Sequence, residues 1–267
     1  MRRRRPDPVA IALGAFVLLF AVFILAPIVI VVVASFSAEN FIAFPITRTS
    51  FRWYWRIVEY RPFLDSLITS VELAFASAAI GAAIAVPAAL ALGRARGPVV
   101  TPVTTFLLAP ISIPAVVLGF ALLYFLSALA FGVSFRSLLV AHSVVAIPYV
   151  FRTVLSVYRA LPASLEESAA ILGAGRWQVL WFVTLPLVRP GLFAGCLFAV
   201  LISLDNLPLS FFFGTAQTNT LPVVVLSYMQ NQFDPSIAAI STVQMAIAVA
   251  VLLVTERMYG LRRLNAL

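Results

Sequence analysis

The clearest chemical signal in this chain is a pair of adjacent carboxylates, Glu166 and Glu167, at the start of a short predicted helix. Ser164 lies three residues before Glu167, which is the spacing of a capping box, and the helix dipole favours negative charge in the first turn. Gly173 and Gly175 are typical of a helix end. The pattern predicts a short helix whose acidic start can accept hydrogen bonds from a partner. A tight helical hairpin that merely joins two longer helices fits the same residues.

A second candidate site centres on Asp205 and Asn206, which lie inside a long apolar stretch. An ionisable group in a membrane span is costly and is a functional candidate by default. Asp205 comes about 14 residues after Gly191, which is about 21 Å along a helix and reaches the outer half of a bilayer. The predicted path for a cationic substrate consists of Asp205, Asn206, Ser203 and Tyr149. The alternative is that Asp205 is a structural carboxylate bonded to a neighbouring helix or to a partner chain.

Three further features have a structural interpretation that we prefer. Glu72 is expected to be a buried acid paired with a serine or an arginine of the helix bundle. His142 is the single histidine and is expected to form structural hydrogen bonds. The triplet Phe211–Phe213 could offer cation–π faces to an amine, but packing against lipid or at an interface is the preferred interpretation.

Several activities are excluded by residue types that the chain lacks. All 18 basic residues are arginine, so a Walker A loop with its lysine is absent and the chain is not expected to hydrolyse ATP itself. Cys196 is the single cysteine, which excludes an intrachain disulfide. No Cys/His cluster with metal-ligand spacing is present. No nucleophile–base constellation and no pair of catalytic carboxylates is evident, so catalysis is not expected.

The composition is that of an integral membrane protein. Hydrophobic residues make up 63% of the 267-residue chain and charged residues 10%, with a mean hydropathy of +1.07. A soluble domain is roughly 45–50% apolar and about 25% charged. The net charge of +8 does not indicate nucleic-acid binding, because the arginines cluster at the ends of apolar runs. Membrane lipid is therefore the expected surrounding.

Six apolar runs are long enough to cross a bilayer, which needs about 20 residues per helix. They are predicted near residues 9–35, 64–93, 100–129, 137–158, 187–213 and 236–257, in a single transmembrane domain over 1–267. With both termini in the cytoplasm, the inner segments hold 13 arginines and the outer segments five, which is the positive-inside bias. The inner set is Arg2 to Arg5, Arg94, Arg96, Arg152, Arg159, Arg176, Arg189, Arg257, Arg262 and Arg263. The segment 159–186 is then a cytoplasmic loop.

This loop resembles the EAA loop of binding-protein-dependent ABC transporter permeases. The family signature is EAA, three residues, G, nine residues, I, one residue, LP. The chain matches it at Glu167-Ser168-Ala169, Gly173, Val183 and Leu185-Pro186, with conservative departures at Ser168 and Val183. The resemblance implies an all-α, polytopic type I ABC importer permease fold with six transmembrane helices in a bacterial inner membrane.

The resemblance also implies how such a subunit works. The EAA helix is the coupling helix, which lies in a groove of a separate ATP-binding subunit, and a soluble binding protein delivers the substrate. The implied partners are a second permease, two ATP-binding subunits that hold ATP and Mg, and the binding protein; no cofactor is expected in this chain. The implied coupling residues are Glu166, Glu167, Ser168, Ala169, Leu172, Gly173, Leu185 and Pro186.

Residues 203–243 resemble the second permease of spermidine/putrescine-type importers, which favours a polyamine substrate and a heterodimeric permease pair. Those proteins usually read SLDD where this chain has Asn206 as the last residue. Alternative substrates are an amino-acid-like compound, thiamine or an iron chelate. A secondary transporter is disfavoured, because the chain shows no internal repeat, and a membrane-embedded enzyme is disfavoured by the missing catalytic groups.

Overall fold

The computed structural model describes residues 8–42, 44–215 and 218–259, and these ranges are helical apart from their connections, with no β-strand. One isolated antiparallel bridge joins Ser37 and Thr49. The chain divides into two compact units: the described residues up to 61 with 228–246, and those of 62–227 with those from 247 onward. The all-α class predicted from the sequence is confirmed for the described ranges.

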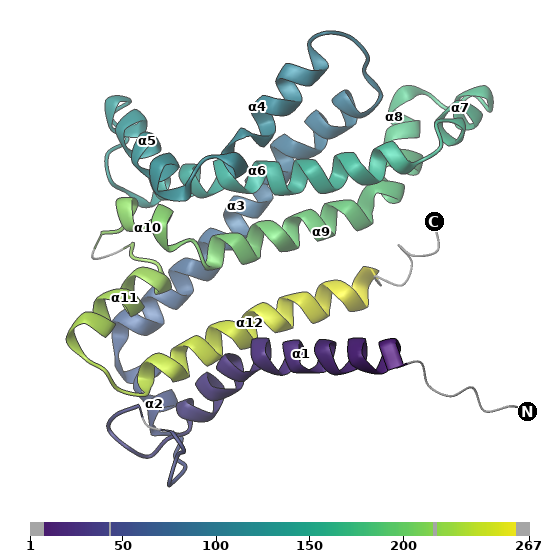
Figure 1. The fold of residues 1–267 in the computed structure, drawn as a ribbon. Helices are drawn as coiled ribbons and strands as arrows, with labels where there is room; N and C mark the ends of the chain where they lie inside the picture. The colour runs from purple at the N-terminus through teal and green to yellow at the C-terminus, as the bar shows by residue number, and fades with distance from the viewer. Residues whose placement is uncertain (1–7, 43, 216–217, 260–267) are drawn as a thin grey trace, which may run out of the picture. The chain divides into compact units, whose positions relative to one another are not determined.

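The first unit contains α1 (Pro8–Ser35), α2 (Arg52–Glu59) and the first half of α12 (Ser236–Tyr259) (Figure 1). None of the most apolar window of α1 is buried within the chain. A helix that is hydrophobic on every side and exposed belongs in lipid. In α2, Trp53 and Ile57 are buried, and the Trp53 indole N–H donates to the carbonyl of Ser37 over 2.8 Å.

The second unit contains all or most of the remaining helices. They are α3 (Arg61–Arg94), α4 (Val100–Ser112), α5 (Ala115–Ala128), α6 (Phe135–Ala160), α7 (Ser164–Ile171), α8 (Arg176–Val179), α9 (Leu185–Leu204), α10 (Leu207–Phe213), α11 (Leu221–Asn231) and the second half of α12. A π-helical turn, Leu180–Thr184, joins α8 to α9.

The core of the second unit lies where α6 and α9 run side by side (Figure 1). Val150, Phe151 and Val154 of α6 are fully buried there. The helices approach closely because α9 presents glycine at the contact: a Cβ added at Gly195 would lie 2.7 Å from the Cα of Val150. Small residues at a helix crossing are the usual means of close packing in membranes.

Among the described residues, five helices are long and apolar enough to cross a membrane, or six if the bent pair α4–α5 counts as one span. The predicted runs 9–35, 64–93, 137–158 and 236–257 agree within three residues with α1, α3, α6 and α12. Of the arginines used for the orientation, Arg2 to Arg5, Arg262 and Arg263 lie outside the described residues.

The predicted third span, 100–129, is not one helix. The structure breaks it into α4 and α5, which are bent by 109°. Ile113 between them has an extended backbone, with φ −89° and ψ 131°. Proline disfavours the helical conformation of the residue before it, so Pro114 accounts for the break.

The predicted fifth span, 187–213, is wrong at both ends. The continuous helical stretch runs from Arg176 to Leu204, so residues 176–186 of the predicted loop 159–186 belong to it. Pro186 lies inside this stretch, just after the π-helical turn Leu180–Thr184. At the other end, Asp205 and Asn206 interrupt the helix, and α10 begins at Leu207.

Candidate functional site

The acidic pair belongs to α7, a two-turn helix with no buried residue. Ser164 is its first residue and not its cap: the capping position is Ala163, whose carbonyl accepts from the backbone N–H groups of Glu166 and Glu167 at 3.1 Å each. The predicted capping box is therefore wrong.

The predicted end of α7 at Gly173 has a specific geometry. Gly173 has φ +91°, a left-handed conformation that favours glycine. Its N–H donates to the carbonyl of Ala170, and the N–H of Ala174 donates to the carbonyl of Ala169, each at 3.0 Å. This pair of bonds is a Schellman motif, so Gly173 both ends α7 and redirects the chain toward α8.

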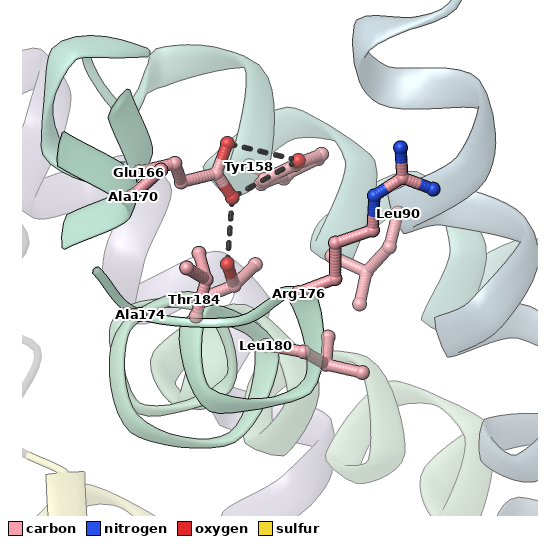
Figure 2. A pocket seen from close by; sticks show the side chains of 9 residues that line it. Leu90, Tyr158, Glu166, Ala170, Ala174, Arg176, Leu180 and Thr184 are labelled. Carbon is pink, nitrogen blue, oxygen red and sulfur yellow. Dashed lines mark hydrogen bonds between the residues drawn. The ribbon is translucent and has the colours of Figure 1, made fainter. Parts of the chain in front are cut away.

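The two glutamates have different environments. The carboxylate of Glu166 accepts hydrogen bonds from the Thr184 hydroxyl at 2.6 Å and from the Tyr158 hydroxyl at 3.1 and 3.3 Å (Figure 2). Arg94 Nε lies 3.6 Å from Glu166 Oε2. Glu167, by contrast, is exposed and forms no ion pair with a described residue. One acid therefore holds α7 to its own chain, and the other faces outward.

The cluster around Glu166 joins four parts of the second unit. Tyr158 comes from the end of α6, Thr184 from the π-helical turn and Arg94 from the end of α3. Arg94 also donates to the carbonyl of Leu161 over 2.8 Å, and its guanidinium lies 4.8 Å from the centre of the Tyr158 ring. We call Glu166, Tyr158, Thr184 and Arg94 the Glu166 clamp.

A cavity of about 330 Å³ opens beside the clamp. Figure 2 shows Ala170 and Ala174 on one side of it and Leu90 on another, with the Arg176 side chain extending away from Glu166 toward Leu90. The small side chains of Ala170 and Ala174 leave this space open.

Large apolar side chains around α7 point to solvent. Ile171 is 85% exposed and Leu172 88% exposed, and Trp177 on α8 is 74% exposed. Apolar groups this exposed in a segment of loops and short helices indicate a protein contact. Ser168 and Gly173 are also exposed, Ala169 is half-buried, and Leu185 and Pro186 form the start of α9, where Leu185 packs against the core.

The predicted substrate-path residues do not form one surface. Ser203 is buried, and its hydroxyl bonds to His142 Nδ1 at 2.8 Å and to Ser77 at 3.4 Å. His142 Nε2 bonds to the Ser210 hydroxyl at 3.1 Å, so both ring nitrogens have partners, as the predicted structural role requires. Ser203 is thus part of an interior network between α3, α6, α9 and α10.

Asp205 and Asn206 lie at the break between α9 and α10. The Asn206 side chain accepts from the backbone N–H of Leu209 at 3.2 Å and caps α10, while Asp205 is exposed and makes no ion pair with a described residue. Tyr149 is half-buried on α6, seven residues beyond His142. Among the four, Asp205 alone presents a charged group outward.

The structure also places Glu72 and the triplet Phe211–Phe213. Glu72 is exposed on α3, so its prediction as a buried acid is wrong. In the Phe triplet, Phe211 is 62% exposed, Phe212 is half-buried and Phe213 is fully buried.

Residues 80–261 match the family described as "Binding-protein-dependent transport system inner membrane component". The chain belongs to this family. It is therefore a permease subunit of an ABC importer, a multi-pass protein of the inner membrane, and the match covers the helices α6 and α9 together with the α7 loop. Such subunits lack an ATPase site of their own, so the chain is not an enzyme in itself.

Three relatives differ in the substrates that their names give. The chain is 27% identical to the spermidine/putrescine permease PotC of Haemophilus influenzae, over 91% of this chain and 94% of that protein. It is 30% identical to the putrescine permease PotI of Escherichia coli, over 82% and 80%. It is 33% identical to the molybdenum permease ModB of Mycobacterium tuberculosis, over 80% and 87%.

Solved structures of bacterial ABC transporters share the fold. A chain of a transporter that imports the acidic polysaccharide alginate aligns with a TM-score of 0.72 and 18% identity, over 97% of this chain and all of that chain. A chain of the methionine transporter MetNI aligns with a TM-score of 0.62 and 17% identity, over 79% of this chain and 98% of that chain.

Proposed function

We propose that α7 is the helix through which this permease subunit couples to a separate ATP-binding subunit. The observation that carries the proposal is that the two glutamates have different environments. Glu166 anchors α7 to its own chain, whereas Glu167 and the nearby Leu172 face outward. A short helix with an exposed charge and an exposed apolar side chain, held from behind, fits a groove on a second protein.

The coupling residues then have three roles. Glu167, Ser168 and Leu172 form the contact surface, because they are exposed. Ala169 keeps α7 narrow, and Gly173 sets its end. Leu185 and Pro186 do not touch the partner: they begin α9 and transmit the position of α7 into the membrane.

The test is to replace Leu172 by Arg in the assembled importer. A buried charge at the interface should weaken retention of the ATP-binding subunit on purification and reduce ATP-driven uptake at least tenfold. Leu172→Met keeps an apolar side chain of similar volume and serves as the control. Normal uptake by Leu172→Arg, with the ATP-binding subunit retained, would remove α7 from the interface.

For the membrane topology, we propose that both termini and the α7 loop are cytoplasmic, as the arginine distribution favours. In a Cys196→Ser background, a cysteine at Ala170 should resist impermeant thiol reagents in intact cells, and a cysteine at Thr218 should react. The opposite labelling pattern would invert the topology.

For the assembly, we propose that the chain pairs with a second, unlike permease, and that two ATP-binding subunits hold ATP and Mg. A soluble binding protein is the proposed substrate donor. The similarity to PotC supports the unlike pair, because the resemblance in residues 203–243 is to the second of two permeases. Purification of the tagged chain and mass measurement of the intact complex test the composition: a complex with two copies of this chain would refute the unlike pair.

For the substrate, we propose a polyamine or a related small amine. Similarity to PotC and PotI supports it, and so does the exposed Asp205 carboxylate, which can attract a cation. The ModB relative favours a molybdenum compound as the second candidate. A thermal-shift screen of the co-encoded binding protein with putrescine, spermidine and molybdate decides between them: stabilisation by molybdate alone would overturn the polyamine proposal.

A further inference from the structure

An apolar groove of about 540 Å³ lies between α3, α9 and α12 within the second unit. Its walls are formed by aromatic, aliphatic and small side chains, among them Phe75, Phe193, Cys196, Val200, Val251 and Val254. Thr255 also lines it, but its hydroxyl donates to the carbonyl of Val251 over 2.8 Å and so offers no free donor. A groove of this lining has nothing to offer to water or to a polar solute.

Arg189 and Arg257 are not among the residues that line the groove, but each lies about one helical turn from one that does. Arg189 precedes Phe193 by four residues on α9, and Arg257 follows Val254 by three residues on α12, so each shares a helix face with a groove residue. In Figure 1, α9 begins and α12 ends on the same side of the second unit. Both arginines are exposed, and neither forms an ion pair with a described residue.

The position of Arg257 fits the edge of the bilayer, because the apolar span of α12 ends there. Arginine side chains near a span end extend along the apolar surface and place the guanidinium at headgroup level. Guanidinium binds phosphate in a bidentate manner, and basic clusters at the end of a span recognise anionic lipid headgroups.

We propose that this groove is a binding site for an anionic phospholipid, with an acyl chain against the apolar walls and the phosphate between Arg189 and Arg257. The charge arrangement favours a lipid over a protein helix, because a helix in the same place would need an acidic residue at the depth of the two arginines. Glu256 is the acid next to Arg257 in the sequence. Successive residues of an α-helix point about 100° apart, so Glu256 faces away from the side of α12 that carries Arg257.

The single cysteine provides a reporter inside the groove. In the intact importer, reconstituted in nanodiscs, a membrane-permeant maleimide should alkylate Cys196 about tenfold more slowly in phosphatidylglycerol than in phosphatidylcholine. A site that is nine-tenths occupied leaves about one thiol in ten open to reaction. In Arg189→Gln/Arg257→Gln the difference between the two lipids should vanish.

Arg159→Gln is the matched control, since Arg159 is exposed at the end of α6, a helix that contributes no residue to the groove, and should leave the lipid difference intact. Native mass spectrometry of the same samples should show phosphatidylglycerol retained by the wild type and by Arg159→Gln but lost from the double variant. Equal alkylation rates in both lipids would overturn the proposal, and so would complete protection of Cys196 in both, which would mean that a protein helix fills the groove.

Discussion

Replacing Glu166 by Gln should release α7 from the rest of the subunit without unfolding it. The wild-type carboxylate accepts from two hydroxyls, those of Thr184 and Tyr158, and lies 3.6 Å from Arg94 Nε. Glutamine keeps one acceptor oxygen and replaces the other with an NH2 group, which cannot accept. Both hydroxyls bond to Oε1, so an amide oxygen at that position still accepts from both, but the two charge-assisted bonds become neutral and the longer Tyr158 contact to Oε2 is lost.

The size of the effect can be worked from these contacts. A hydrogen bond to a charged group contributes about 1.5–3 kcal/mol and a neutral one about 0.5–1.5 kcal/mol. The Glu166 side chain is 24% exposed and that of Arg94 33% exposed, so the ion pair itself adds little. We expect a loss of about 2 kcal/mol in the docking of α7, which corresponds to about 30-fold more frequent opening.

Hydrogen exchange measures this opening directly, because local opening exposes the backbone amides of one element at a time. In the purified protein in nanodiscs, amides of α7 should exchange about 30-fold faster in Glu166→Gln, while those of α6 and α9 keep their wild-type rates. Glu167→Gln is the matched control and should leave the α7 rates within twofold of wild type. Unchanged α7 exchange in Glu166→Gln, or equal acceleration in both variants, would refute the assignment of Glu166 as the anchor.

Three other substitutions test separate parts of the structure. Gly195→Ala should lower the thermal midpoint of the purified complex, because the added Cβ would lie 2.7 Å from the Cα of Val150. Such overpacking costs about 1–3 kcal/mol. Gly14→Ala is the control and should leave the midpoint unchanged, because no atom lies within 4 Å of a Cβ added there. Gly173→Val should speed exchange at the end of α7 through backbone strain of about 1–2 kcal/mol, whereas Gly173→Asn should be milder, and equal effects would argue against the strain. Asp205→Asn should slow uptake of putrescine with no change in thermal midpoint, because Asp205 is exposed and unpaired among the described residues; a parallel loss of stability would make Asp205 structural.

The membrane helices were predictable because a span leaves a long apolar run, and the ends of α1, α3, α6 and α12 follow from where such runs stop. The third and fifth spans were not, because breaks are decided by single residues inside an apolar run. Pro114 is visible in the sequence and marks the break, but a proline alone does not specify the 109° angle between the two arms. In the sequence, Asn206 is an amide inside an apolar run. In the structure, its side chain caps α10.

The roles of the site residues were less predictable than their location. The sequence places Glu166 and Glu167 together, yet it cannot say which faces inward, because Arg94 and Thr184 lie 72 residues before and 18 residues after Glu166. The sequence predicts Ser203 in the substrate path with Asp205 and Asn206, whereas in the structure it bonds to His142, which lies 61 residues earlier on α6, in the interior. The pairing of distant polar groups is a property of the packing, and no local spacing encodes it.

The π-helical turn Leu180–Thr184 sets the direction in which α7 faces. In this turn the N–H of Leu185 donates to the carbonyl of Leu180, five residues back, so the turn holds one residue more than an α-helical turn would. Deleting one residue here would restore the α-helical register and rotate everything before it by about 100° around the axis of α9. Thr184 would no longer meet Glu166, and the exposed face of α7 would point elsewhere. The orientation of the exposed surface of α7 thus depends on the number of residues in this one turn, and two chains with the same loop residues but a different number here would present them in different directions.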